Sequence, residues 1–173
     1  MTLFQSASEI ETRSIQLSTR KNTTIPNEQY LGISSFNENQ FPLLLAKLKG
    51  RKPRTKPSGI YNCHGLVFAS RRTAITERAM LEQILKEDGY KKIDGNEVGP
   101  GDVIIYFKDG MPTHSGIILS GTPSVLAGGN PAMVLGKLGW YGEAVHPFNL
   151  QLFEFDLIEY YKVDDDDYGR TEL

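Results

Sequence analysis

A hairpin pattern in the second half of the chain constrains the fold more than any other feature. Residues 103–107 and 115–120 are two runs rich in β-branched and aromatic side chains, which favour strands. They are joined through Lys108-Asp109-Gly110, a turn sequence typical of β-hairpins. Further strand candidates lie at 124–127, 133–135 and 152–161. The pattern predicts an antiparallel sheet in this half of the chain.

The first half of the chain shows helical patterns instead. A helix is expected to start at or just after Asn62-Cys63 and to run to about Ser70. A second helix is expected after a threonine cap, Thr73 or Thr76, because apolar residues then recur at helical spacing. Helices followed by antiparallel strands indicate the α+β class.

The chain length and its polar end segments predict the domain organisation. At 173 residues, 39% of them hydrophobic, the chain fits one domain with a core, which we place at 29–163. Residues 1–28 are polar and without a clear period, so we expect a loosely docked N-terminal arm. Residues 164–173 begin with four aspartates and form an acidic tail, which we expect to be disordered.

Charge and cysteine content exclude several classes of protein. The formal net charge of −2 gives no reason to expect nucleic acid or an anionic membrane as a partner. A single cysteine excludes an internal disulfide framework and a cysteine-based zinc site. No run approaches the ~18 apolar residues needed to span a bilayer. Residues 1–20 lack a secretory signal, so the expected location is cytoplasmic unless a dedicated system delivers the protein elsewhere.

The only cysteine, Cys63, and His114 form the candidate catalytic pair. At a helix start, the helix dipole and unpaired N–H groups favour a thiolate and can stabilise an oxyanion. Gly65 is expected to keep this helix start narrow, so that a substrate backbone can approach. His114 would act as base toward Cys63 and as acid toward the leaving amine. If the two segments do not meet in space, Cys63 is a buried structural thiol.

Three segments resemble the NlpC/P60 group of papain-like peptidases, and the related CHAP-type amidases share their order. They are Asn-Cys-His-Gly-Leu-Val at 62–67, Pro-Gly-Asp-Val-Ile-Ile-Tyr at 100–106 and Thr-His-Ser-Gly-Ile-Ile-Leu at 113–119. The resemblance covers roughly residues 60–120. It implies a papain-like α+β fold in which helices, with Cys63 at a helix start, pack on an antiparallel sheet. It also implies Cys63 as nucleophile, His114 as base, and no cofactor or metal.

The third catalytic residue of that group, which orients the imidazole, has no clear match in this chain. Residues 132–139 offer no ready acceptor for an imidazole N–H. Asn130 is closest to the expected place, with Glu143 and His146 as alternatives, and a backbone carbonyl could also serve. The third role therefore stays open.

Residues beside the thiol are expected to line its cleft. Tyr61 and Asn62 precede the thiol and are candidates for the cleft or the oxyanion site. His64 adjoins Cys63 but points about 100° away from it on a helix, as a structural residue or a cleft wall. The basic, proline-interrupted loop at 49–56 lies just before the thiol and would attract an acidic substrate if it borders the cleft.

The sequence predicts a thiol hydrolase acting on a peptide or protein substrate. The bond would be a peptide, isopeptide or peptidoglycan stem-peptide amide, attacked by the Cys63 thiolate with His114 as general base and acid. An acyltransferase or deamidase on the same scaffold is one alternative. The other is a non-catalytic or regulatory papain-like interaction domain that lacks a complete triad. A redox-sensing cysteine is less attractive, because no resolving cysteine is present.

Overall fold

The computed structural model describes residues 10–33, 39, 42–43, 46, 48, 53–121, 123, 131–149 and 154–163. In these residues, two short strands come first, two helices follow, and a run of strands comes last. They are β1 (Thr12–Arg13), β2 (Gln29–Tyr30), α2 (Cys63–Phe68), α3 (Ala79–Glu87), β3 (Tyr90–Ile93), β4 (Val103–Lys108), β5 (Met111–Ser120), β6 (Met133–Lys137), β7 (Glu143–Pro147) and β8 (Leu157–Val163).

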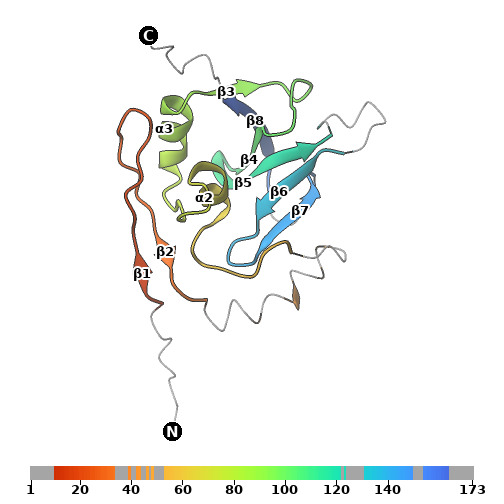
Figure 1. Ribbon diagram of the computed structural model, residues 1–173. Coiled ribbons are helices and arrows are strands. Elements are labelled where there is room, and N and C mark those ends of the chain that lie inside the picture. Colours follow the sequence, from red (N-terminus) through yellow and green to blue (C-terminus); the bar gives the residue numbers. More distant parts are fainter. Residues whose placement is uncertain are drawn as a thin grey trace, which may run out of the picture.

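One antiparallel sheet dominates the fold (Figure 1). Its strands follow the order β3-β8-β4-β5-β6-β7, and each neighbouring pair is antiparallel. The short strands β1 and β2 pair with each other in a separate ribbon. The α+β class expected from the sequence is therefore confirmed.

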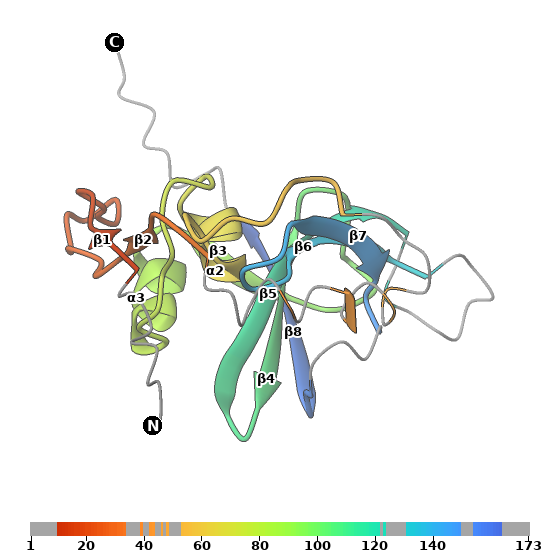
Figure 2. The same ribbon diagram turned by 90° about the horizontal axis from the view of Figure 1, so that it is seen from below.

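The β4–β5 hairpin contains the turn expected from the sequence. Asp109 and Gly110 both have positive φ, 50° and 74°, which is the backbone that a two-residue hairpin turn of type I′ requires. The second strand begins at Met111 rather than at 115, so that it already includes His114. Figure 2 shows this end of the hairpin extending away from the helices.

Both expected helices are present, with shifted ends. α2 begins at Cys63 and stops at Phe68, after which Ser70 and Arg71 adopt positive φ. α3 begins at Ala79 after an N-cap residue that makes no side-chain capping bond, so neither expected threonine caps it. Figures 1 and 2 both place α2 between the sheet on one side and α3 with the β1–β2 ribbon on the other.

Residues 10–28, the described part of the polar N-terminal segment, contact the core through two apolar side chains. Among the described residues of this segment, Leu17 and Ile25 are buried in a cluster that also contains side chains of both helices. The Asn27 side chain further ties the segment together by bonding the backbone of Ile15 and Ile25. Two apolar anchors fix this segment to the core in spite of its many polar positions.

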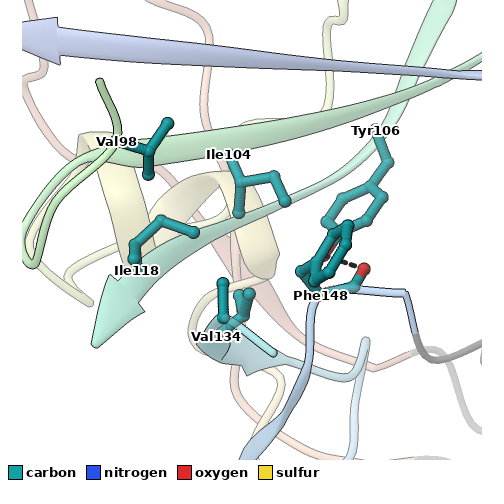
Figure 3. Close-up of a cluster of buried hydrophobic side chains, with 7 residues drawn as sticks. Val98, Ile104, Tyr106, Ile118, Val134 and Phe148 are labelled. Carbon is teal, nitrogen blue, oxygen red and sulfur yellow. Dashed lines mark hydrogen bonds between the residues drawn. The ribbon is translucent and has the colours of Figure 1, made fainter. Parts of the chain in front are cut away.

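The main apolar cluster lies on the sheet. Its buried members come from β4, β5, β6 and the adjoining loops (Figure 3); they are Val98, Ile104, Tyr106, Ile118, Ala132, Val134 and Phe148. The Tyr106 hydroxyl is buried with them and donates to the Phe148 carbonyl at 2.8 Å. The cluster makes the central strands a rigid support for His114. None of the helices in the described part of the chain is long and apolar enough to cross a membrane.

Candidate active site

The side chain of Asn62 fixes the start of α2. Its Oδ1 accepts the N–H of Gly65 at 2.8 Å and the N–H of Ile75 at 3.2 Å, and its Nδ2 donates to the Ile75 carbonyl at 2.8 Å. This is an N-cap that also binds the next segment of the chain. The amide is thereby engaged in structure, and it sets the position of Cys63, the first helical residue.

Gly65 allows α2 to pack closely on a neighbouring segment. A Cβ at this position would lie 1.9 Å from the backbone oxygen of Thr73. Glycine is therefore required at this position because the Thr73 backbone packs against it. The expectation that Gly65 opens the helix start toward a substrate is wrong.

Cys63 is buried beside two imidazoles. Burial raises the pKa of the Cys63 thiol, but the charges of His64 and His114 and their side-chain hydrogen bonds to the sulfur lower it more. The net pKa lies well below the usual value for cysteine. The structure thus brings Cys63 and His114 together, as the sequence suggested, and adds His64 as a second neighbour.

His64 is linked to the residue that follows His114. Its Nδ1 lies 3.0 Å from the hydroxyl oxygen of Ser115 in β5, and both side chains are buried. Two successive residues of α2 therefore meet two successive residues of β5. His64 was expected to be a structural residue or a cleft wall, and Ser115, which has no motif of its own, was expected to have no role.

His146, in β7, lies beside His114. Their ring centroids are 6.3 Å apart, and a Cβ at Gly136, on the strand between them, would lie 2.9 Å from Nε2 of each ring. Nδ1 of His146 lies 2.9 Å from the Pro147 carbonyl oxygen, which can only accept, so this nitrogen carries the hydrogen. Of the candidates for the third position, His146 is brought to His114, whereas Asn130 lies outside the described residues.

Glu143, the other candidate for the third position, is engaged elsewhere. Its carboxylate accepts from the Tyr61 hydroxyl at 2.7 Å and from the Arg71 guanidinium at 2.5 and 3.2 Å. Burial raises the pKa of Glu143, but these two partners outweigh it and lower the pKa below its usual value. Burial and the bond to Glu143 raise the pKa of Tyr61 to about 12, so its phenol stays protonated.

Lys137, at the end of β6, is fully buried. Its Nζ donates to three backbone carbonyls, those of Ser58 at 2.9 Å, Gly139 at 2.6 Å and Tyr141 at 3.1 Å. The ammonium also lies 5.0 Å from the ring centroid of Tyr61. Burial lowers the pKa of Lys137 to about 8. The lysine joins the segment that precedes Cys63 to the loop after β6, a link that sequence reasoning missed.

A cavity of about 220 Å³ opens next to the thiol-bearing turn. Its lining includes Tyr61 and Asn62, the two residues that precede Cys63, and the side chains of Tyr30 and Trp140. Tyr30 and Trp140 pack edge to face, with centroids 4.8 Å apart. Tyr61 and Asn62 thus line a cavity, and that this cavity belongs to the cleft of the thiol stays a prediction.

The described part of the basic loop, residues 53–56, pairs with β7. The Arg54 N–H donates to the Glu143 carbonyl at 2.6 Å, and the Thr55 hydroxyl accepts the N–H of Glu143 at 2.8 Å. Residues 49–52, which carry three of its charges, lie outside the described residues.

No family model matches the chain, and no curated protein or solved structure matches it. Within the described residues, no group of three or more His, Cys, Asp or Glu side chains is placed to hold a metal ion.

Proposed function

We propose that this protein is a cysteine hydrolase that cleaves an amide bond through the Cys63 thiolate, on a papain-like scaffold of the NlpC/P60 type. The observation that carries the proposal is the surroundings of the thiol. Cys63 is buried at a helix start, hydrogen-bonded to two imidazoles that hold its pKa well below the usual value. A thiolate is the nucleophilic form of cysteine, and an adjacent histidine is its usual partner in catalysis.

The first half of the reaction uses the helix start. The thiolate sulfur attacks the substrate carbonyl carbon, and the carbonyl electron pair moves to oxygen. First-turn N–H groups have no acceptor within their helix, and that of Gly65 is taken by the Asn62 side chain. The N–H groups of Cys63 and His64 are therefore the donors we assign to the oxyanion, each worth about 3 kcal/mol where such donors have been removed.

The second half uses His114. The C–N bond breaks as the imidazolium of His114 gives its proton to the departing amine, which leaves a thioester on Cys63. His114, now neutral, takes a proton from a water molecule that attacks the thioester, and the acid is released. An amine in place of water would make the same site an acyltransferase, and a glutamine side chain as substrate would make it a deamidase.

His146 is the residue that we assign to the orienting position. Nε2 of His146 and Nε2 of His114 converge on Gly136, which has no Cβ to separate them. Because Nδ1 of His146 faces the Pro147 carbonyl, its Nε2 presents a lone pair in the neutral ring. That lone pair can accept a hydrogen bond from the His114 ring and hold its orientation. A helix-borne cysteine packed on an antiparallel sheet also supports the papain-like scaffold.

Alkylation of Cys63 tests the proposal. Because Cys63 is the only cysteine, mass spectrometry of iodoacetamide-treated protein reports on it alone. We expect the midpoint of the wild-type rate profile to lie well below the value of about 8.5 for a free cysteine, because the neighbouring imidazoles lower the pKa of the thiol. His114→Ala should move the midpoint up by about one to three pH units, since an opposite charge close by shifts a pKa by that much.

The midpoint, rather than the absolute rate, is the quantity to compare, because loss of the ring also opens space for the reagent. Exposed Thr76→Ala is the matched control and should keep the wild-type midpoint. A wild-type midpoint near 8.5 would overturn the proposed function. Amide hydrolysis should be lost in Cys63→Ala and fall by about 10²–10⁴-fold in His114→Ala.

A further inference from the structure

The residues that line the cavity next to the Cys63 turn determine which kind of guest side chain can bind there. Its walls include the rings of Tyr30, Tyr61 and Trp140, together with Ala74 and Thr76. None of the described residues that line it carries a charged side chain. An apolar wall of aromatic rings favours an uncharged guest, because a charged group would lose its hydration without gaining an opposite charge.

The size of the cavity limits that guest to one side chain. A volume of about 220 Å³ is smaller than the ~300–1,000 Å³ typical of sites for drug-sized ligands. It exceeds the ~150 Å³ of an apolar cavity that is known to hold benzene. A phenyl ring or a branched aliphatic side chain therefore fits, whereas a sugar ring with its hydroxyls would leave polar groups without partners.

The walls are held in place before any guest enters. Gly59 allows Tyr30 and Trp140 to meet, because a Cβ there would lie 2.4 Å from the Trp140 ring and 2.8 Å from Cβ of Tyr30. The Ser58 N–H donates to the Trp140 carbonyl at 2.9 Å, and Lys137 binds carbonyls on both sides of this contact. A preformed pocket loses little conformational entropy on binding.

We propose that this cavity is the subsite that receives an uncharged aromatic or branched aliphatic side chain of a peptide substrate, next to the amide attacked by Cys63. The substrate class rests on the function proposed above, whereas binding of the side chain does not. Asn62 connects the two, since it lines the cavity and caps the helix that begins at Cys63. A guest in the cavity would thus touch the residue that precedes the nucleophile in the chain.

Binding can be measured without catalysis, because Trp140 is the only tryptophan of the chain. We expect N-acetyl-phenylalaninamide to change the fluorescence of the full-length Cys63→Ser protein in a saturable way. N-acetyl-lysinamide and N-acetyl-glutamate amide should not. Thr76→Phe, which adds a ring at an exposed position of the cavity lining, should weaken binding by about tenfold or more, and Thr24→Phe, at an exposed threonine outside the cavity, should not.

Substrate preference is measured with two peptide vinyl sulfones that differ only in phenylalanine or glutamate beside the electrophile. The phenylalanine reagent should alkylate wild-type Cys63 at least about tenfold faster. Equal rates with no fluorescence response would overturn the subsite, even if iodoacetamide shows a low thiol pKa. A high thiol pKa with a saturable, phenylalanine-selective fluorescence response would overturn the proposed function and leave the side-chain pocket standing.

Discussion

Two clusters of polar side chains lie around α2, and they differ in what their charged groups do. The Glu143 cluster contains Tyr61, Arg71, Lys137 and Glu143; the thiol cluster contains Cys63, His64, His114, Ser115 and His146. In the Glu143 cluster, each charged group has fixed hydrogen-bonding partners: Arg71 and Glu143 bind each other, and Lys137 binds backbone carbonyls. In the thiol cluster, the groups are a thiol and imidazoles, and the imidazoles lower the pKa of the thiol.

The comparison separates a structural network from a reactive one. An ion pair that is fully hydrogen-bonded holds segments in place, and removing one member leaves the others buried without compensation. A thiol between imidazoles is instead stabilised as the thiolate, which is its more reactive form. We therefore expect substitutions in the Glu143 cluster to lower mainly the free energy of unfolding, and those in the thiol cluster to change mainly the titration of Cys63.

The largest effect on stability should follow from Lys137→Met. The substitution keeps the aliphatic stem but removes the donor to three backbone carbonyls. Because breaking a buried charged network costs about 3–5 kcal/mol, we expect a loss of about 3 kcal/mol in urea unfolding. Lys92→Met is the matched control, since Lys92 is 62% exposed and its ion pair with Glu159 is worth at most about 1 kcal/mol. Equal losses in the two variants would contradict a structural role for Lys137.

A smaller effect, divided between stability and reactivity, should follow from Gly136→Ala. The new Cβ would lie 2.9 Å from Nε2 of both His114 and His146, so the two buried rings must move apart. We expect a loss of about 1–3 kcal/mol in urea unfolding, as for other overpacked sites. The alkylation midpoint of Cys63 should rise, because the displaced His114 ring supports the thiolate less well.

Gly99→Ala is the control for this variant. A Cβ at Gly99 would meet only the Asp102 carboxylate, at an ordinary 3.9 Å, so both measurements should stay close to those of the wild type. If Gly136→Ala lowers stability without moving the midpoint, the contact between the two histidines does not support the thiolate.

The sequence predicted those parts of this arrangement that have local signals. The Asp109-Gly110 turn, the helical pattern that starts at Asn62-Cys63 and the apolar runs of β4 and β5 each depend on neighbouring residues, so the hairpin and α2 could be expected. Cys63 and His114 also stand in recognisable segments. That these two segments lie close together was a hypothesis, because the sequence does not show which segments meet in the fold.

The remaining contacts depend on long-range packing. Arg71 and Glu143 are 72 positions apart, and His146 reaches His114 only because β6 places a glycine between their strands. Lysine is rarely buried, so nothing in the sequence around Lys137 indicates that its ammonium binds three carbonyls. A polar composition likewise concealed Leu17 and Ile25, because two buried residues are enough to anchor a polar segment.

The smallest expected effect comes from Ser115→Ala, which tests whether His64 belongs functionally with the thiol. The Ser115 hydroxyl lies 3.0 Å from Nδ1 of His64, where it can accept a hydrogen bond from the protonated ring. Its loss would leave the His64 ring without this partner and so weaken the support that the ring gives to the thiolate. A hydrogen bond of about 1 kcal/mol corresponds to an upward shift of about 0.7 pH units in the alkylation midpoint. Ser120→Ala, at the exposed end of the same strand, should shift nothing. An unchanged midpoint in Ser115→Ala would leave His114 as the main support of the thiolate and make His64 a structural residue.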